Sequence, residues 1–449
     1  MRAKRSKIYK VKKYPHFDNK IHWQDVRHEI ENPDYIVHHA FYPFIHYVQE
    51  MPKYPKNYLM SENSKQGKRD DPKERNIMYS AHFDRYIYEY YAYKVNQCYN
   101  KYAKENRINN CAVAYRNNHP GKNNIHYASS AFSVIRRMKD AMIIIGDFTH
   151  YFDQIKHDYL KKMLMRVMRV DQLPDDYYKV FRSITKHAWL ELDDIRAYKG
   201  IGRKEFNKLD RIFTPDELRM YKKGRLKRNK NDYGIPQGSA ISAVFSNVYL
   251  IEFDCMLNDY ITGMNGFYCR YCDDFIIVVP WGTEEKRIEI IDYIFSAVNR
   301  IPNLKLEPSK TQVFHYADRC IEGVSSHYLG CDMPEKNFIA YLGFAFDGKT
   351  VTIRSKTIAK YYERMYRKID GITRNNGFTR FGHRIPMHNL YRLYSYKGKR
   401  VDKRKKKKGN FLSYVDRALE VFGPEESIDR DTKHAWGKMQ KRLRKRHDR

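Results

Sequence analysis

The sequence predicts an α+β fold organised around an antiparallel sheet. The apolar run 141–146 has the pattern of a buried strand and ends on an acid, Asp147. Two β-prone runs flank the adjacent acids Asp273 and Asp274, which indicates a hairpin with the acids at or beside its turn. Apolar side chains recur at helical spacing elsewhere, as in 81–100, and these segments add helices to the fold.

The N-terminal region is rich in basic and aromatic residues. Residues 23–31 indicate a short helix, and the aromatic, largely apolar stretch 35–51 predicts a packed helix. The polar and charged residues 61–76 predict an exposed loop before the helix at 81–100.

From residue 107 onward, loops and helices alternate around the predicted strands. Before the hairpin we expect a polar loop at 107–124, helices at 127–139 and 157–170, irregular structure at 174–232 with a basic loop at 222–230, a turn at 234–238 and a helix at 239–254. After it we expect an amphipathic helix at 284–299, strands around Val313 and at 341–346, and helices at 356–370 and 411–422.

The composition indicates a large protein that meets a polyanion. The 449 residues are 42% hydrophobic, enough for two or three domain-sized units. The formal net charge of +32 destabilises a compact chain through self-repulsion unless an anionic partner is present. Nucleic acid is the first candidate, and an anionic membrane surface is the weaker one.

Other features of the sequence favour a cytoplasmic protein that does not bind a membrane. There is no run of about 18 apolar residues of the kind that spans a bilayer. The basic residues 1–7 are followed by no apolar segment, so they do not form a secretory signal. The seven cysteines are scattered and odd in number, which suits a reducing compartment.

Strands that carry Asp147, Asp273 and Asp274 would be neighbours in one sheet. Two adjacent acids alone are equally consistent with a solvated turn, since Asp is common in turns. Three carboxylates on adjoining strands repel one another unless a cation binds, and they can hold two Mg²⁺ ions about 3.5–4 Å apart. Such a centre serves in-line nucleotidyl transfer onto a 3′-hydroxyl, and Mn²⁺ is an alternative ion.

Five segments in order along the chain resemble the motifs of reverse transcriptases. Residues 147–155 resemble motif A, 234–247 motif B, Tyr271-Cys272-Asp273-Asp274 motif C, 306–311 motif D and 341–344 motif E. The resemblance covers roughly residues 70–350. It implies an α+β right-hand polymerase with fingers, a palm whose antiparallel sheet carries the catalytic acids, and a helical thumb.

The resemblance also implies domain boundaries. It places a basic, aromatic N-terminal extension at 1–65, the fingers at 66–140, and the palm at 141–345 with a finger insertion and basic loop at about 175–232. The helical thumb and a basic C-terminal tail follow at 346–449.

In this family the matched acids are catalytic metal ligands, which assigns that role to Asp147, Asp273 and Asp274 and places Phe148 in the same metal site. Phe152, five positions after Asp147, matches the steric gate that excludes a ribose 2′-hydroxyl, so we expect a DNA product. Core packing is the alternative role for its ring.

Further matched residues are expected to bind the incoming dNTP. Gln237 and Gly238 fit a turn that touches the nucleotide and template base, although an ordinary turn before a helix has the same pattern. Lys310 would lie near the leaving pyrophosphate, and Arg75 and Arg116 are candidates for triphosphate contacts because guanidinium groups fork onto phosphate.

Basic runs predict the surface that binds nucleic acid. They could equally be solvated loops, but the net charge favours contact with phosphates. The residues assigned to this surface are Lys403, Arg404, Lys405, Lys406, Arg225 and Lys227.

Within the family, residues 341–355 are similar to defence-associated bacterial enzymes of the abortive-infection and unknown-group type, with retron and group II intron enzymes as relatives. The expected function is RNA-directed DNA synthesis in anti-phage defence on a cognate non-coding RNA, with a partner protein or homo-oligomer conceivable. One alternative is protein-primed or template-independent DNA synthesis by the same site. Another is a catalytically silent RNA-binding scaffold.

Overall fold

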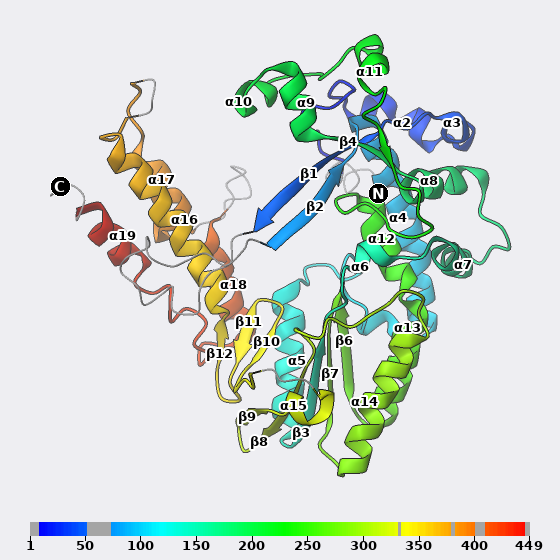
Figure 1. Cartoon of the computed structure of the whole chain (residues 1–449). Helices are drawn as coiled ribbons and strands as arrows, with labels where there is room; N and C mark the ends of the chain where they lie inside the picture. The colour runs from blue at the N-terminus through cyan, green and yellow to red at the C-terminus, as the bar shows by residue number, and fades with distance from the viewer. Residues whose placement is uncertain (1–8, 52–72, 331–333, 379–381, 400–408, 445–449) are drawn as a thin grey trace.

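The computed structural model describes residues 9–51, 73–330, 334–378, 382–399 and 409–444 (Figure 1). At its centre lies a sheet of strand order β6-β7-β3-β8-β9 in which all neighbours are antiparallel. These strands are β3 (Ala141–Gly146), β6 (Phe267–Tyr271), β7 (Asp274–Pro280), β8 (Gln312–Ala317) and β9 (Cys320–Gly323). The predicted strand at 141–146 and the predicted hairpin around the paired acids are both confirmed.

The central strand β3 is buried on both faces, and its side chains alternate between two apolar cores. Met142 and Ile144 share one core with α13 (Ile251–Gly263) and α14 (Glu284–Asn299). Ile143 and Ile145 share the other with α5 (Asn124–Met138). Because helices cover both faces of the sheet at this strand, all of its side chains are apolar.

A second sheet, of strand order β2-β1-β4-β5, lies in the N-terminal half. Its strands are β1 (Phe44–Met51), β2 (Lys73–Tyr79), β4 (Ala188–Glu191) and β5 (Lys227–Arg228). The predicted helix at 35–51 is therefore wrong: Pro43 precludes a continuous helix, and the chain forms α3 (Pro33–His38) and then β1. The predicted loop at 61–76 is also wrong at its end, because residues 73–76 belong to β2, while 61–72 lie outside the described residues.

Residues 174–232 are more regular than predicted. They form α8 (Asp175–Thr185) before the short strand β4, and α9 (Leu192–Lys199), α10 (Arg203–Phe206) and α11 (Pro215–Tyr221) between β4 and the short strand β5. The helices α9, α10 and α11 each bury one or two apolar side chains in a core shared with Phe17 and Ile45, whereas α8 packs into the main core. The start of α11 carries a capping box between Thr214 and Glu217, a signal that is readable in the sequence.

The helix predicted at 239–254 is two helices, α12 (Ala240–Tyr249) and α13, with a bend of 49° between them. Together this bent pair is long and apolar enough to meet the criteria for a membrane span, but most of the α12 side chains are buried inside the protein. No single helix in the described part of the chain meets those criteria.

The C-terminal part joins a small antiparallel sheet to a group of helices (Figure 1). The predicted strand at 341–346 is split by a turn at Leu342 and Gly343, both of positive φ. The small sheet consists of β10 (Ile339–Tyr341), β11 (Phe344–Phe346) and β12 (Val351–Ile353). The helices of this C-terminal part are α16 (Ser355–Arg374), α17 (Met387–Tyr394), α18 (Phe411–Phe422) and α19 (Ala435–Arg444). Residues from α16, α18 and α19 share the core that contains α5.

The remaining predicted helices are confirmed with small shifts at their ends. They are α2 (Trp23–Glu31), α4 (His82–Glu105), α5, α7 (His157–Met168), α14, α16 and α18. Two further α-helices are short, α6 (Tyr151–Gln154) and α15 (Ser325–Leu329), and two 3-10 helices lie at Ile108–Asn110 and Tyr396–Gly398.

Candidate active site

The pairing register of β3 with β7 brings the three predicted acids together. Gly146, the last residue of β3, pairs with Phe275 near the start of β7. Asp147 and Asp274 therefore adjoin this pair at one edge of the sheet, and Asp273 lies in the two-residue turn between β6 and β7. The Phe275 ring covers Gly146 so closely that a Cβ there would lie 2.2 Å from it, so glycine fits this position.

Electrostatic repulsion accompanies this convergence. The pKa of Asp274 is raised to about 7 by burial and by the charges of Asp273 and Asp147. Lys310 and Arg354 oppose the shift. The Lys310 Nζ lies 2.6 Å from Asp147 Oδ2, so a side-chain ammonium already partly neutralises the cluster.

The donor chemistry of this cluster fits a hard divalent cation. Carboxylate oxygens are the ligands that Mg²⁺ prefers, and a cation relieves the repulsion that raises the Asp274 pKa. In the described part of the chain, no three acidic, His or Cys side chains already stand in ligating geometry. The Phe148 ring packs against Phe253 and Phe275, so only its backbone carbonyl could serve the metal site.

A cavity of about 940 Å³ opens beside the acids. It contains Asp147 and Asp273 together with all the predicted nucleotide-binding residues except Arg116. The predicted residues that line it are Asp147, Phe148, Phe152, Gln237, Gly238, Asp273, Lys310 and Arg75. Its size is in the range of small-molecule and cofactor sites.

The turn at 234–238 holds two elements at the cavity wall. The Ile235 amide donates to the Phe152 carbonyl (3.0 Å), which links the turn to α6. The Met78 amide of β2 donates to the Gln237 carbonyl (2.8 Å). Gly238 has φ +118°, and a Cβ there would lie 2.5 Å from the Met78 carbonyl oxygen, so only glycine allows this approach.

The structure does not bring Arg116 to the cavity. Its guanidinium donates to the Asn100 and Asn109 side chains and to the Ala112 carbonyl, and it lies over the Tyr99 ring. These contacts use the donors that a triphosphate would need.

Two of the residues predicted to bind nucleic acid, Arg225 and Lys227, belong to the described part of the chain. Arg225 stacks over Tyr198 and Tyr221, and Lys227 forms a 2.9 Å ion pair with Glu191. Neither lines the cavity. Lys403, Arg404, Lys405 and Lys406 lie outside the described residues.

Tyr115 is a cavity residue that sequence reasoning missed. Its side chain is 48% exposed, its φ is +56°, and its carbonyl accepts a 2.7 Å hydrogen bond from Asn96. Burial raises the pKa of its hydroxyl, as do the neighbouring Cys272 and Asp273. No local pattern in the sequence signals a tyrosine of positive φ at this position.

Comparisons with known proteins agree with this geometry. Residues 97–346 match the family model described as reverse transcriptase (RNA-dependent DNA polymerase). No curated protein matches the chain.

Among solved structures, apo telomerase from Candida tropicalis is similar at 11% identity over 90% of this chain and 66% of that one, with a TM-score of 0.43. A form truncated from its C-terminal domain aligns at 12% identity over 69% of this chain and 55% of that one, with a TM-score of 0.41. The Sicinivirus 3Dpol RNA-dependent RNA polymerase aligns at 10% identity over 64% and 49%, with a TM-score of 0.34. The chain thus spans about half to two thirds of these relatives' lengths.

At these scores the family match carries the assignment, not the individual structures. It covers more than half of the 449 residues and contains the acids, the turn at 234–238 and Lys310. The α+β right-hand polymerase fold predicted from the sequence is confirmed, and the chain belongs to the reverse transcriptase family of RNA-dependent DNA polymerases.

Proposed function

We propose that this protein is an RNA-directed DNA polymerase that extends a 3′-hydroxyl with dNTPs on an RNA template. The observation that carries the proposal is the meeting of Asp147, Asp273 and Asp274 beside a cavity of about 940 Å³, within the segment that matches the reverse transcriptase family. A protein built only to hold RNA gains nothing from clustered carboxylates, which repel phosphate.

The domain assignment follows the resemblance. We assign the extension to 1–65, the fingers to 66–140, the palm to 141–345 with an insertion at 175–232, and the thumb and tail to 346–449. The central sheet lies inside the palm range, which supports this division.

In the proposed reaction the 3′-hydroxyl oxygen forms a bond to the α-phosphorus of the dNTP, and the bond to pyrophosphate breaks. Asp147, Asp273, Asp274 and the Phe148 carbonyl would hold two Mg²⁺ or Mn²⁺ ions. When bound, such ions lower the pKa of the attacking hydroxyl and neutralise the leaving group.

The chain's own side chains would select and orient the dNTP. The Phe152 ring is half-buried at the cavity wall, where it would meet the sugar 2′ position. The turn at Gln237 and Gly238 would contact the nucleotide. Lys310, now on Asp147, would move to the leaving pyrophosphate, and exposed Arg75 would contact the triphosphate.

We further propose that the template is a cognate non-coding RNA and that the enzyme acts in the cytoplasm in bacterial anti-phage defence. The similarity of residues 341–355 to defence-associated enzymes supports the defence setting, and the net charge of +32 supports a bound RNA. Protein-primed or template-independent synthesis is the alternative, and Tyr115, a partly exposed tyrosine that lines the cavity, is compatible with it.

The test uses the full chain with the RNA that co-purifies from cells, Mg²⁺, and labelled dNTPs or NTPs. We expect a DNA product that is sensitive to removal of the RNA before the reaction. Asp273→Asn with Asp274→Asn should abolish synthesis and retain RNA binding, whereas Asp259→Asn, an exposed position on α13, should change neither. Unchanged synthesis by the double variant would refute the assignment of these acids, and a product joined to the protein would select the protein-primed alternative.

A further inference from the structure

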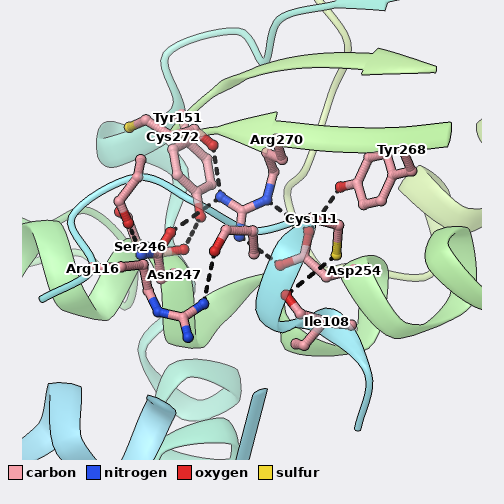
Figure 2. Close-up of polar contacts among 12 residues, drawn as sticks. Ile108, Cys111, Arg116, Tyr151, Ser246, Asn247, Asp254, Tyr268, Arg270 and Cys272 are labelled. Carbon is pink, nitrogen blue, oxygen red and sulfur yellow. Dashed lines mark hydrogen bonds and ion pairs between the residues drawn. The ribbon is translucent and has the colours of Figure 1, made fainter. Parts of the chain in front are cut away.

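An ion pair that is fully sequestered from solvent contacts Cys272, the residue before Asp273 in the hairpin turn (Figure 2). Arg270 comes from β6 and Asp254 from α13, and both side chains are 0% exposed. Arg270 Nε donates to Asp254 Oδ1 at 2.7 Å, and Nη2 donates to Oδ2 at 2.5 Å. The fork geometry is the one in which Arg binds carboxylate most strongly.

A buried ion pair is weak evidence for stability, because apolar side chains of similar volume often serve a core equally well. The position of the remaining guanidinium donor is more informative. Arg270 Nη1 donates to the carbonyl oxygen of Cys272 at 2.7 Å and to Asn247 Oδ1 at 3.3 Å. The Tyr268 hydroxyl donates to Asp254 Oδ1 at 2.7 Å, which completes the carboxylate's partners.

The accepting carbonyl belongs to a residue with a strained backbone. Cys272 has φ +63° and is the first central residue of the hairpin turn, where glycine is favoured. Its carbonyl is part of the peptide group that leads into Asp273. Arg270 therefore holds that peptide group by its carbonyl oxygen and links it to Asp254 on α13 and Asn247 on α12 (Figure 2).

The network extends to the rim of the cavity. Asn247 Nδ2 donates to the Ala114 carbonyl at 2.7 Å, and the backbone of Arg270 exchanges hydrogen bonds with Cys111 and Val113. The segment that leads to Tyr115 is thus joined to the same guanidinium. A merely apolar core could not make these directional contacts.

We propose that Arg270, held by Asp254, is a positioning residue that clamps the Cys272–Asp273 peptide and so sets where the Asp273 carboxylate stands relative to Asp147 and Asp274. The inference rests on the proposed polymerase function for its catalytic consequence. The clamp itself is a statement about the turn and can be tested without catalysis.

The first variant is Arg270→Lys, in the full chain with its RNA. Lysine keeps a charge for Asp254 but has no fork that can also reach the Cys272 carbonyl. We expect kcat to fall about 100-fold, as a misplacement of about 1 Å can cause. KM for dNTP and the affinity for RNA should stay unchanged, because neither depends on Asp273 alone. A kcat equal to that of the wild type would overturn the proposal.

The second variant removes the charges together, as Arg270→Met with Asp254→Leu, and so keeps an apolar core if the lysine variant fails to fold. Adding Cys272→Gly should raise kcat about ten-fold above that of the double variant. Glycine adopts a positive φ without backbone strain, so the turn would keep its conformation without Arg270. A purely structural role predicts no rescue, so absence of rescue in a folded triple variant would contradict the clamp.

A readout independent of synthesis is the rate at which N-ethylmaleimide labels Cys272, measured by peptide mass spectrometry. Cys272 and Cys269 are both buried, and Cys269 reports on general loosening of the same strand. In Arg270→Lys we expect labelling of Cys272 to rise about ten-fold through local opening of the turn, with Cys269 unchanged. No rise, or equal rises at both cysteines, would refute a local clamp. If the wild type makes no DNA, the proposed function fails while this labelling result still stands.

Discussion

At the residue scale, Gly238 lies directly against the backbone of β2 at the cavity wall. Its φ of +118° and the 2.5 Å that would separate a Cβ from the Met78 carbonyl oxygen are two separate obstacles to a side chain. Gly121 has a positive φ of +80° but open space around it. A substitution at Gly121 therefore tests backbone strain alone, whereas one at Gly238 adds a steric clash.

We predict that Gly238→Ala lowers the free energy of unfolding by about 1–3 kcal/mol more than Gly121→Ala does, because overpacking adds to backbone strain. Thermal unfolding of the two variants side by side measures the difference. Gly238→Ala should also weaken dNTP binding, since β2 carries Arg75 at the cavity. Equal destabilisation by the two variants would show that β2 yields to the added methyl group.

Phe152 allows a second prediction at this scale. Its ring is half-buried, packs edge-on to Tyr151 and lines the cavity, so both a gate and a packing role remain structurally compatible. We predict that Phe152→Ala reduces the preference for dNTP over NTP by about 100-fold in kcat/KM, the scale at which pocket shape discriminates.

Phe152→Tyr is the matched control for the gate, because it keeps the bulk of the ring and should retain the preference for dNTP. If Phe152→Ala lowers both rates equally and leaves their ratio at the wild-type value, the ring is a packing residue only.

The three acids could be located from the sequence because each follows or interrupts a strongly β-prone run. Once these runs pair as neighbouring strands, their ends bring the acids to the same edge of the sheet. Arg116 shows where this reasoning ends. An Arg near a motif is equally able to bind a phosphate or the loop that surrounds it, and here it binds the Asn100 and Asn109 side chains. The Lys310 contact with Asp147 likewise depends on a register that the sequence does not state.

At the scale of elements, the N-terminus of α4 is capped from a distant part of the chain. Ala81, the N-cap residue, provides no side-chain cap. Asp18 instead accepts hydrogen bonds from the His82 and Phe83 amides at 2.9 and 2.8 Å, and Asp18 is buried. The N-terminal segment is thereby fastened to the longest helix of the core.

We predict that Asp18→Ala lowers the free energy of unfolding by about 1–2 kcal/mol, the usual cost of losing a cap. Asp18→Asn should cost less, because it retains an acceptor oxygen. Asp259→Ala, at an exposed position on α13, is the control and should stay within about 0.5 kcal/mol of the wild type. Chemical unfolding curves of the three variants decide, and an effect of Asp18→Ala no larger than the control would contradict the capping role.

Helices with a clear apolar periodicity could be predicted well, and α14 begins and ends where the pattern does. The failures have identifiable causes. The stretch 35–51 is aromatic throughout, which suits a strand as well as a helix, and Pro43 decides between them. The bend between α12 and α13 leaves no local signal, because the buried side chains of α12 run on into those at the start of α13 without a Gly or Pro between the two helices.

At the scale of the whole molecule, positive charge faces positive charge between the N-terminal sheet and the C-terminal helices. Figure 1 shows the β1–β2 hairpin directed toward α16. The pKa of Lys360 on α16 is lowered by burial and by the charges of Arg364 and of Arg75 on β2. Such repulsion between β2 and α16 is relieved when a polyanion binds beside them.

This arrangement predicts that the affinity for RNA falls steeply as salt increases. We expect Lys360 and Arg364 on α16 to account for part of the slope of log K against log salt. Each phosphate contact on a single strand contributes about 0.7 to the slope of log K against log salt, so Lys360→Ala with Arg364→Ala should reduce its magnitude by about 1.4. The matched control is Lys101→Ala with Lys104→Ala, two exposed charges on α4, which removes the same net charge. Filter binding of the co-purified RNA between 50 and 200 mM salt, a range in which phosphate contacts are strongly weakened, measures both slopes. Equal slopes for the two double variants would mean that the total charge of the protein, and not the charges of Lys360 and Arg364 in particular, sets the salt dependence of RNA binding.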